Sequence, residues 1–161
     1  MQPLAEIRFY HLTALPLERA LPPMLERTLE RDQRAVVRGV DRERLATLDR
    51  HLWIYSDESF LPHGMDGDPE PARQPIWLTV ADEVPNRAST LFLVDGATAS
   101  PEEMAAMQVT AILFDGNDES AKEAARGQWR MVTGAGLAAV YWAQDENGRW
   151  VKQHETAAEG R

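Results

Sequence analysis

The sequence predicts a single α/β domain in which an open, largely parallel sheet carries helices on both faces. Short apolar segments alternate with segments of helical periodicity, as in parallel sheets whose strands are joined by helical crossovers. Several apolar segments are nearly continuous, which is typical of strands buried on both faces. The length of 161 residues suits one domain with its own core, and the absence of cysteine excludes disulfides and thiolate sites.

The first part of the chain predicts two strand–helix units. Residues 6–12 alternate apolar and polar side chains and predict the opening strand. Leucines recur every four residues from position 17 to 29 and predict a helix, although the proline pair at 22 and 23 is tolerated only near a first turn. Residues 34–38 predict a second strand, and Asp41 predicts the cap of a second helix.

The remainder predicts a long loop and then further strands and helices. Residues 56–75 are rich in Pro, Gly and Asp, which predicts an irregular loop of a length that is often functional. Ser100 and Glu103 form a capping box that begins a short helix, and Asp118 begins the last helix, which runs to about residue 133. Strands are predicted over 76–80, 90–94, 109–114, 138–142 and 150–152. The domain is thus expected over 1–152, with a flexible tail over 153–161.

The net charge of the chain indicates which classes of partner it can bind. A formal net charge of −9 opposes binding to a phosphate backbone, because affinity for nucleic acid comes mostly from Lys and Arg. No apolar run approaches the length needed to cross a bilayer, and no leader pattern begins the sequence. We therefore expect a cytoplasmic protein that contacts DNA only indirectly and no membrane.

Motifs for nucleotide binding are weak or absent. Residues 134–139 match the spacing of a dinucleotide fingerprint, but here the glycines end a helix and lead into a strand, which favours a C-cap. The loop after the first strand, residues 12–16, has no glycine and carries a proline. The prediction is a Rossmann-like fold without a nucleotide site. A small nucleotide-dependent enzyme on a doubly wound sheet is kept as the alternative.

Metal and nucleophile patterns are equally weak. Asp66, Asp68 and Glu70 alternate as in a calcium loop but lack its central glycine and distal glutamate, so a solvated acidic loop is the better interpretation. Ser59 has no nucleophile-elbow setting. The four histidines lie in different elements without ligand spacing, at positions 11, 51, 63 and 154. We expect no catalytic residue, no metal and no cofactor.

A basic stripe marks the last predicted helix. Lys122, Arg126 and Arg130 recur every four residues, and Trp129 lies three residues after Arg126, so these side chains form one stripe. Residues 120–136 carry a net charge of +2. On composition alone, a solvated helix face with Trp129 turned into the core is the favoured interpretation.

A second cluster places large apolar side chains around the start of the long loop. Trp53 ends a predicted helix, and Phe60 and Leu61 follow in the loop. Exposed aromatic residues at such a position indicate a partner surface. The alternative, in which Trp53 and Phe60 close over the core, is about equally favoured.

Taken together, these motifs resemble the chi subunit family of bacterial DNA polymerase III. No motif is specific alone, but their order and spacing from Ile7 to about Trp142 resemble that family. The motifs are Phe9-Tyr10-His11-Leu12, Leu48-Asp49-x-x-Leu52-Trp53, Ser59-Phe60-Leu61-Pro62-His63-Gly64, Pro75-Ile76-Trp77-Leu78-Thr79 and Ala125-Arg126 with Trp129 before Gly136.

The resemblance implies a non-catalytic adaptor that links the clamp loader, through its psi subunit, to the acidic C-terminal tail of single-stranded-DNA-binding protein. By position, the tail would be received by Lys122, Arg126 and Trp129, with Arg130 in the same stripe. Psi would bind around Trp53 and Phe60, with the adjacent Leu61. One departure is Trp129, which stands where the family pattern has tyrosine and so keeps stacking area but loses a hydroxyl.

Overall fold

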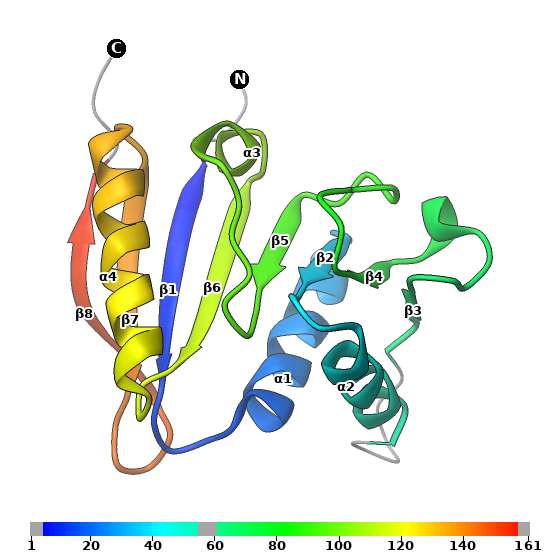
Figure 1. The fold of residues 1–161 in the computed structure, drawn as a ribbon, viewed down its shortest axis with the longest axis horizontal. Helices are drawn as coiled ribbons and strands as arrows, with labels where there is room; N and C mark the ends of the chain where they lie inside the picture. The colour runs from blue at the N-terminus through cyan, green and yellow to red at the C-terminus, as the bar shows by residue number, and fades with distance from the viewer. Residues whose placement is uncertain (1–4, 55–60, 158–161) are drawn as a thin grey trace.

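The computed structural model describes residues 5–54 and 61–157, which form one eight-stranded sheet covered by helices (Figure 1). The strand order is β3-β4-β2-β5-β6-β1-β7-β8. Every neighbouring pair is parallel except β7 with β8. This arrangement confirms the predicted open, largely parallel α/β fold.

The elements follow the predicted alternation along the chain. The strands are β1 (Glu6–Leu12), β2 (Ala35–Arg38), β3 (Gly64–Met65), β4 (Ile76–Thr79), β5 (Thr90–Leu93), β6 (Val109–Asp115), β7 (Ala138–Gln144) and β8 (Trp150–Thr156). The helices are α1 (Leu17–Glu30), α2 (Arg42–Ile54), the 3-10 turn η1 (Pro71–Arg73), α3 (Pro101–Ala105) and α4 (Glu119–Gly134). No helix in the described part of the chain is long and apolar enough to cross a membrane.

The core has two layers because both faces of the sheet are covered. One apolar cluster joins α1 and α2 to one face and includes Leu21 and Leu48. The other joins α3 and α4 to the opposite face and includes Met104 and Val132. Strands β2, β4 and β5 are buried at every residue, as their nearly continuous apolar sequences predict.

Local signals in the sequence set the helix ends. Ser100 and Glu103 form the predicted capping box at the start of α3. The Asp118 side chain accepts from the backbone N–H of Ser120 and Ala121 and begins α4. Gly136, with φ +82°, follows the end of α4 and turns the chain into β7, so the glycine segment is a helix end and not a phosphate loop.

Three local predictions are corrected. The proline pair lies in the second turn of α1 and not near its first, and burial of Leu21 and Leu25 against the sheet holds the helix there. The 56–75 segment contains β3 and η1, which are too short for a periodic signal. Strand β8 runs to Thr156, four residues into the predicted tail, because an exposed edge strand needs no apolar alternation.

Candidate functional site

The basic stripe lies on the outer side of α4, which packs over the β1 and β7 region of the sheet (Figure 1). Arg126 and Arg130 are exposed, and Lys122 is partly exposed. The three cations therefore share one accessible helix face, as their spacing predicts.

Trp129 lies between the core and the surface. It is partly buried against the α4-side core, and its ring packs edge-on to Phe9 with centroids 5.3 Å apart. Its ring centroid is 6.1 Å from that of Tyr141 and 5.5 Å from that of His154. The interpretation that Trp129 turns inward is thus partly right, and the ring packs against side chains of strands β1, β7 and β8 beside the cations of α4.

Two of the cations of α4, Lys122 and Arg126, pair with carboxylates of their own helix. Lys122 Nζ lies 2.9 Å from Glu119 Oε1, and an Arg126 nitrogen donates to Glu123 Oε2 at 2.8 Å. The bond and charge of Lys122 hold the pKa of Glu119 below its usual value. Solvated pairs three residues apart contribute little to stability. An incoming carboxylate can therefore replace either acidic partner at small cost.

Two further side chains, which lie far from α4 in the sequence or on another element, border this surface. His11 Nδ1 lies 2.7 Å from the Tyr141 hydroxyl, across neighbouring strands β1 and β7. Burial raises the pKa of Tyr141, and the charge of Arg126 opposes that rise. We use the name α4 surface for Lys122, Arg126, Trp129, Arg130, His11, Tyr141 and His154.

The second predicted surface is only partly formed as expected. Trp53 is 51% exposed and Ile54 is 77% exposed at the end of α2, so this helix end presents apolar area to solvent. Phe60 lies outside the described residues. Leu61 is 2% exposed and belongs to the core cluster beneath α1 and α2, which corrects its assignment to the surface.

A buried histidine, His63, bonds to the backbone of Leu61 and to that of α2. His63 Nδ1 lies 2.6 Å from the Leu61 carbonyl oxygen, and Nε2 lies 3.2 Å from the Asp49 carbonyl oxygen. These contacts join the segment that begins at Leu61 to α2. The Trp53 ring rests on the imidazole, with centroids 4.1 Å apart. His63 therefore has a structural role, and no group of three potential metal ligands occurs in the described ranges.

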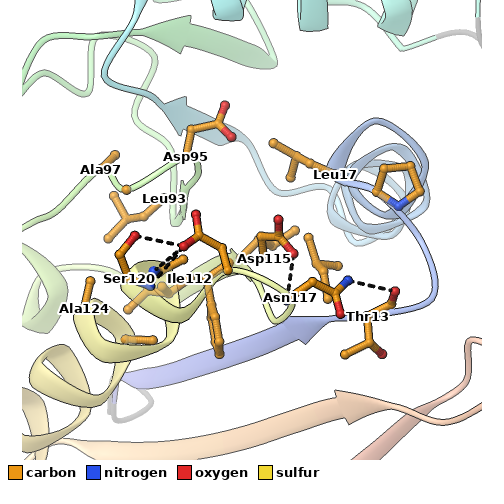
Figure 2. A pocket seen from close by; sticks show the side chains of 18 of the residues that line it. Thr13, Leu17, Leu93, Asp95, Ala97, Ile112, Asp115, Asn117, Ser120 and Ala124 are labelled. Atoms are coloured by element: carbon orange, nitrogen blue, oxygen red, sulfur yellow. Dashed lines mark hydrogen bonds between the residues drawn. The ribbon is translucent and has the colours of Figure 1, made fainter.

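A cavity of about 770 Å³ lies at the carboxyl ends of β1, β5 and β6, where doubly wound folds bind their ligands. Figure 2 shows side chains that line it. Leu17, Leu93 and Ile112 contribute apolar lining. Asp95, Asp115 and Asp118 contribute carboxylates. If the chain were the nucleotide-dependent enzyme of the alternative, its nucleotide would be expected in this cavity.

The charges of this cavity do not favour a nucleotide. Asp118 already occupies the N-terminal donors of α4, and hydrogen bonds from the Ser120 hydroxyl and from the backbone keep its pKa below the usual value. Arg44 is paired with Glu18 and Asp95. A phosphate group here would face carboxylates, since Arg44 is the only Lys or Arg among the described lining residues, and the loop from β1 to the start of α1 has no glycine to bring its backbone close to phosphate.

A family model described as "DNA polymerase III chi subunit, HolC" matches residues 4–140. The chain belongs to the chi subunit family. It is also 32% identical over 89 residues to the "Probable DNA polymerase III subunit chi" of Rickettsia prowazekii (strain Madrid E). That alignment covers 55% of this chain and 54% of the relative, so the chain spans about half the length of this curated chi relative.

The range of the chi match divides the α4 surface. All of α4 and His11 lie within residues 4–140, whereas Tyr141 and His154 lie beyond them. The helical cations are therefore part of what the chi family model describes. Tyr141 and His154 are assigned to the α4 surface from the structure of this chain alone, because the family match does not reach them.

Proposed function

We propose that this chain is a non-catalytic accessory subunit of DNA polymerase III in DNA replication. In this proposal it links the clamp loader, through psi, to the acidic C-terminal tail of single-stranded-DNA-binding protein. One observation carries the proposal: accessible cations and a packed aromatic ring meet on α4 in a molecule whose net charge is −9. Such a surface favours an acidic peptide over nucleic acid.

The side chains of α4 would divide the work of holding the tail. The planar guanidinium of Arg126 can hold a carboxylate through two parallel hydrogen bonds once Glu123 is displaced. Lys122 would add a less directional positive charge, and Arg130 a further guanidinium along the same face. Trp129 would supply the apolar wall, and its packing on Phe9 means that no side-chain order must be gained on binding.

The expected affinity follows from the disorder of such a tail. A flexible peptide must be ordered on binding, which offsets part of the contact energy and favours micromolar over nanomolar dissociation constants. The cations are exposed, so binding should also weaken as salt rises.

Calorimetric titration of a short acidic peptide ending in phenylalanine tests the tail site. Arg126→Ala should weaken the peptide roughly tenfold to a hundredfold, because a charge-assisted bond contributes about 1.5 to 3 kcal/mol. Arg73→Ala is the matched control, since Arg73 is an exposed arginine that lies 3.6 Å from a glutamate three residues away, at the β3 end of the sheet. Equal affinities of wild type and Arg126→Ala would place the tail site elsewhere.

The same proposal assigns the surface around Trp53 and Phe60 to psi. The exposure of Trp53 and Ile54 supports it, since exposed apolar area at a helix end is typical of a partner surface. Co-purification of psi with this chain from a coexpression strain is the direct test. Retention of psi by wild type but not by Trp53→Ala would support the assignment.

A further inference from the structure

The His11–Tyr141 pair gives the α4 surface a group whose charge changes with pH. His11 lies on β1, and its ring is packed between Phe114 and Tyr141, with centroids 5.1 and 5.9 Å away. The Nε2 edge of the ring lies against Gly116, where an added Cβ would come within 1.9 Å of Nε2. The imidazole is therefore fixed in position and partly exposed beside the cations of α4.

The hydrogen bonds around the ring define its neutral form. Nε2 is the ring nitrogen that lies against Gly116, and in the tautomer that carries its proton on Nε2 the other nitrogen, Nδ1, is an acceptor. The Tyr141 hydroxyl, 2.7 Å away, then donates its proton to Nδ1. In this state the hydroxyl proton points inward and cannot donate to a ligand.

We propose that His11 and Tyr141 form a proton-linked carboxylate site beside Arg126, in which protonation of His11 turns the Tyr141 hydroxyl proton toward the peptide. A proton from solvent binds Nδ1, which then donates to the Tyr141 oxygen. The hydroxyl proton is released to donate to a carboxylate of the bound peptide. This inference rests on the proposed tail site and adds to it a second anchor that depends on pH.

The groups that face His11 set the direction of the linkage. Burial lowers the pKa of His11, and the charges of Lys122 and Arg126 on α4 lower it further. The Gly116 backbone and the Asp115 carboxylate at the end of β6 oppose this shift. A peptide carboxylate bound at Arg126 adds negative charge and offsets the two cations, so it raises the pKa of His11. The complex therefore takes up a proton, and affinity rises as pH falls.

Titration of the acidic, phenylalanine-terminated peptide at about pH 5.5 and about pH 8 tests the linkage. Wild type should bind roughly threefold to tenfold tighter at the lower pH, with proton uptake seen as a dependence of the binding heat on the buffer's ionisation enthalpy. His11→Gln should lose both the gain and the uptake. Tyr141→Phe should lose most of the gain while retaining affinity at the higher pH.

Three controls separate the possible sources of an effect. His51→Gln removes a histidine of α2, which packs on the opposite face of the sheet, and should keep the wild-type pH response. Circular dichroism establishes that each variant is folded. Nuclear magnetic resonance titration of the His11 ring should show its pKa rising when the peptide is added.

Two outcomes would overturn different statements. The same pH response in wild type and His11→Gln, with Arg126→Ala still weaker than wild type, would refute the proton link but leave the tail site intact. No loss of affinity in Arg126→Ala at either pH would refute the tail site itself.

Discussion

The two candidate surfaces of this chain differ in how they are built. The α4 surface takes its side chains from regular elements: a long helix and the neighbouring strands β1, β7 and β8. The surface around Trp53 lies where α2 ends and an irregular segment begins. Helical spacing was sufficient to group the cations of α4. Spacing does not determine whether a residue that follows a helix is buried. Leu61 was expected at the surface but lies in the core.

The two surfaces also differ in how far their residues contribute to the stability of the fold. On α4, Arg126 is exposed and its contribution to the fold is small. Near α2, the exposed Trp53 ring packs on the buried His63 ring. His63 bonds to the carbonyl oxygen of Leu61, whose side chain lies in the core. Substitutions a few residues apart in this region should therefore have opposite effects on stability and on partner binding.

The largest expected effect tests that separation directly. Leu61→Ala should lower the free energy of unfolding by about 2 to 5 kcal/mol, because it removes a fully packed leucine from the core. Trp53→Ala, at a half-exposed position, should cost clearly less. Urea denaturation of both variants measures the difference. An unchanged free energy of unfolding in Leu61→Ala would contradict the burial of Leu61 in the core.

The second prediction concerns partner binding at the same place. If the helix end anchors psi, Trp53→Ala should weaken psi by about 2 kcal/mol or more, or roughly thirtyfold. Arg126→Ala should leave psi affinity unchanged, since it lies on the other surface. Surface plasmon resonance with immobilised psi compares the two. Loss of psi binding in both variants would mean that the two surfaces are not independent.

A third prediction examines the stability of the α4 half of the sheet. Gln144 Oε1 accepts the backbone N–H groups of Thr13, Ala14 and Leu15, and so holds the β1–α1 loop. Gln144→Leu should lower the free energy of unfolding by about 1 to 3 kcal/mol, because these donors lose their acceptor. Chemical denaturation gives the value. A change below experimental error would show that water replaces the side chain fully.

The smallest expected effect is an absence of binding. Despite the cations of α4, the net charge of −9 should keep the isolated chain from binding single-stranded DNA with a dissociation constant below about 100 µM. Fluorescence anisotropy with a labelled oligonucleotide at low salt measures it. A micromolar, salt-sensitive isotherm would mean that the α4 surface serves nucleic acid.

The fold could be predicted wherever local signals were strong. The capping box at Ser100, the Asp118 cap and the glycines after α4 each depend on neighbouring residues alone. Strand β3 was missed because two residues carry no periodicity, and the end of β8 was misplaced because most of its side chains are exposed. Exposed edges leave little trace in hydrophobic pattern.

The candidate site was predictable only along the helix. Lys122, Arg126 and Trp129 share a helix, so their spacing was enough. His11 and Tyr141 are 130 residues apart and meet because β1 lies between β6 and β7. Strand order of this kind cannot be derived from one sequence. The sequence pattern tests His11 only as a metal ligand, and the signal for its role is the aromatic run that contains it, Phe9-Tyr10-His11-Leu12.

The central position of β1 also has a consequence for synthesis. This strand pairs on one side with Val109–Asp115 and on the other with Ala138–Gln144. During translation both edges of β1 must wait for residues made about 100 positions later, or roughly 5 to 20 s at ordinary elongation rates. A strand with one apolar face and two open edges is prone to association during that interval. The nascent chain should therefore depend on protection by ribosome-associated chaperones until α4 and β7 emerge.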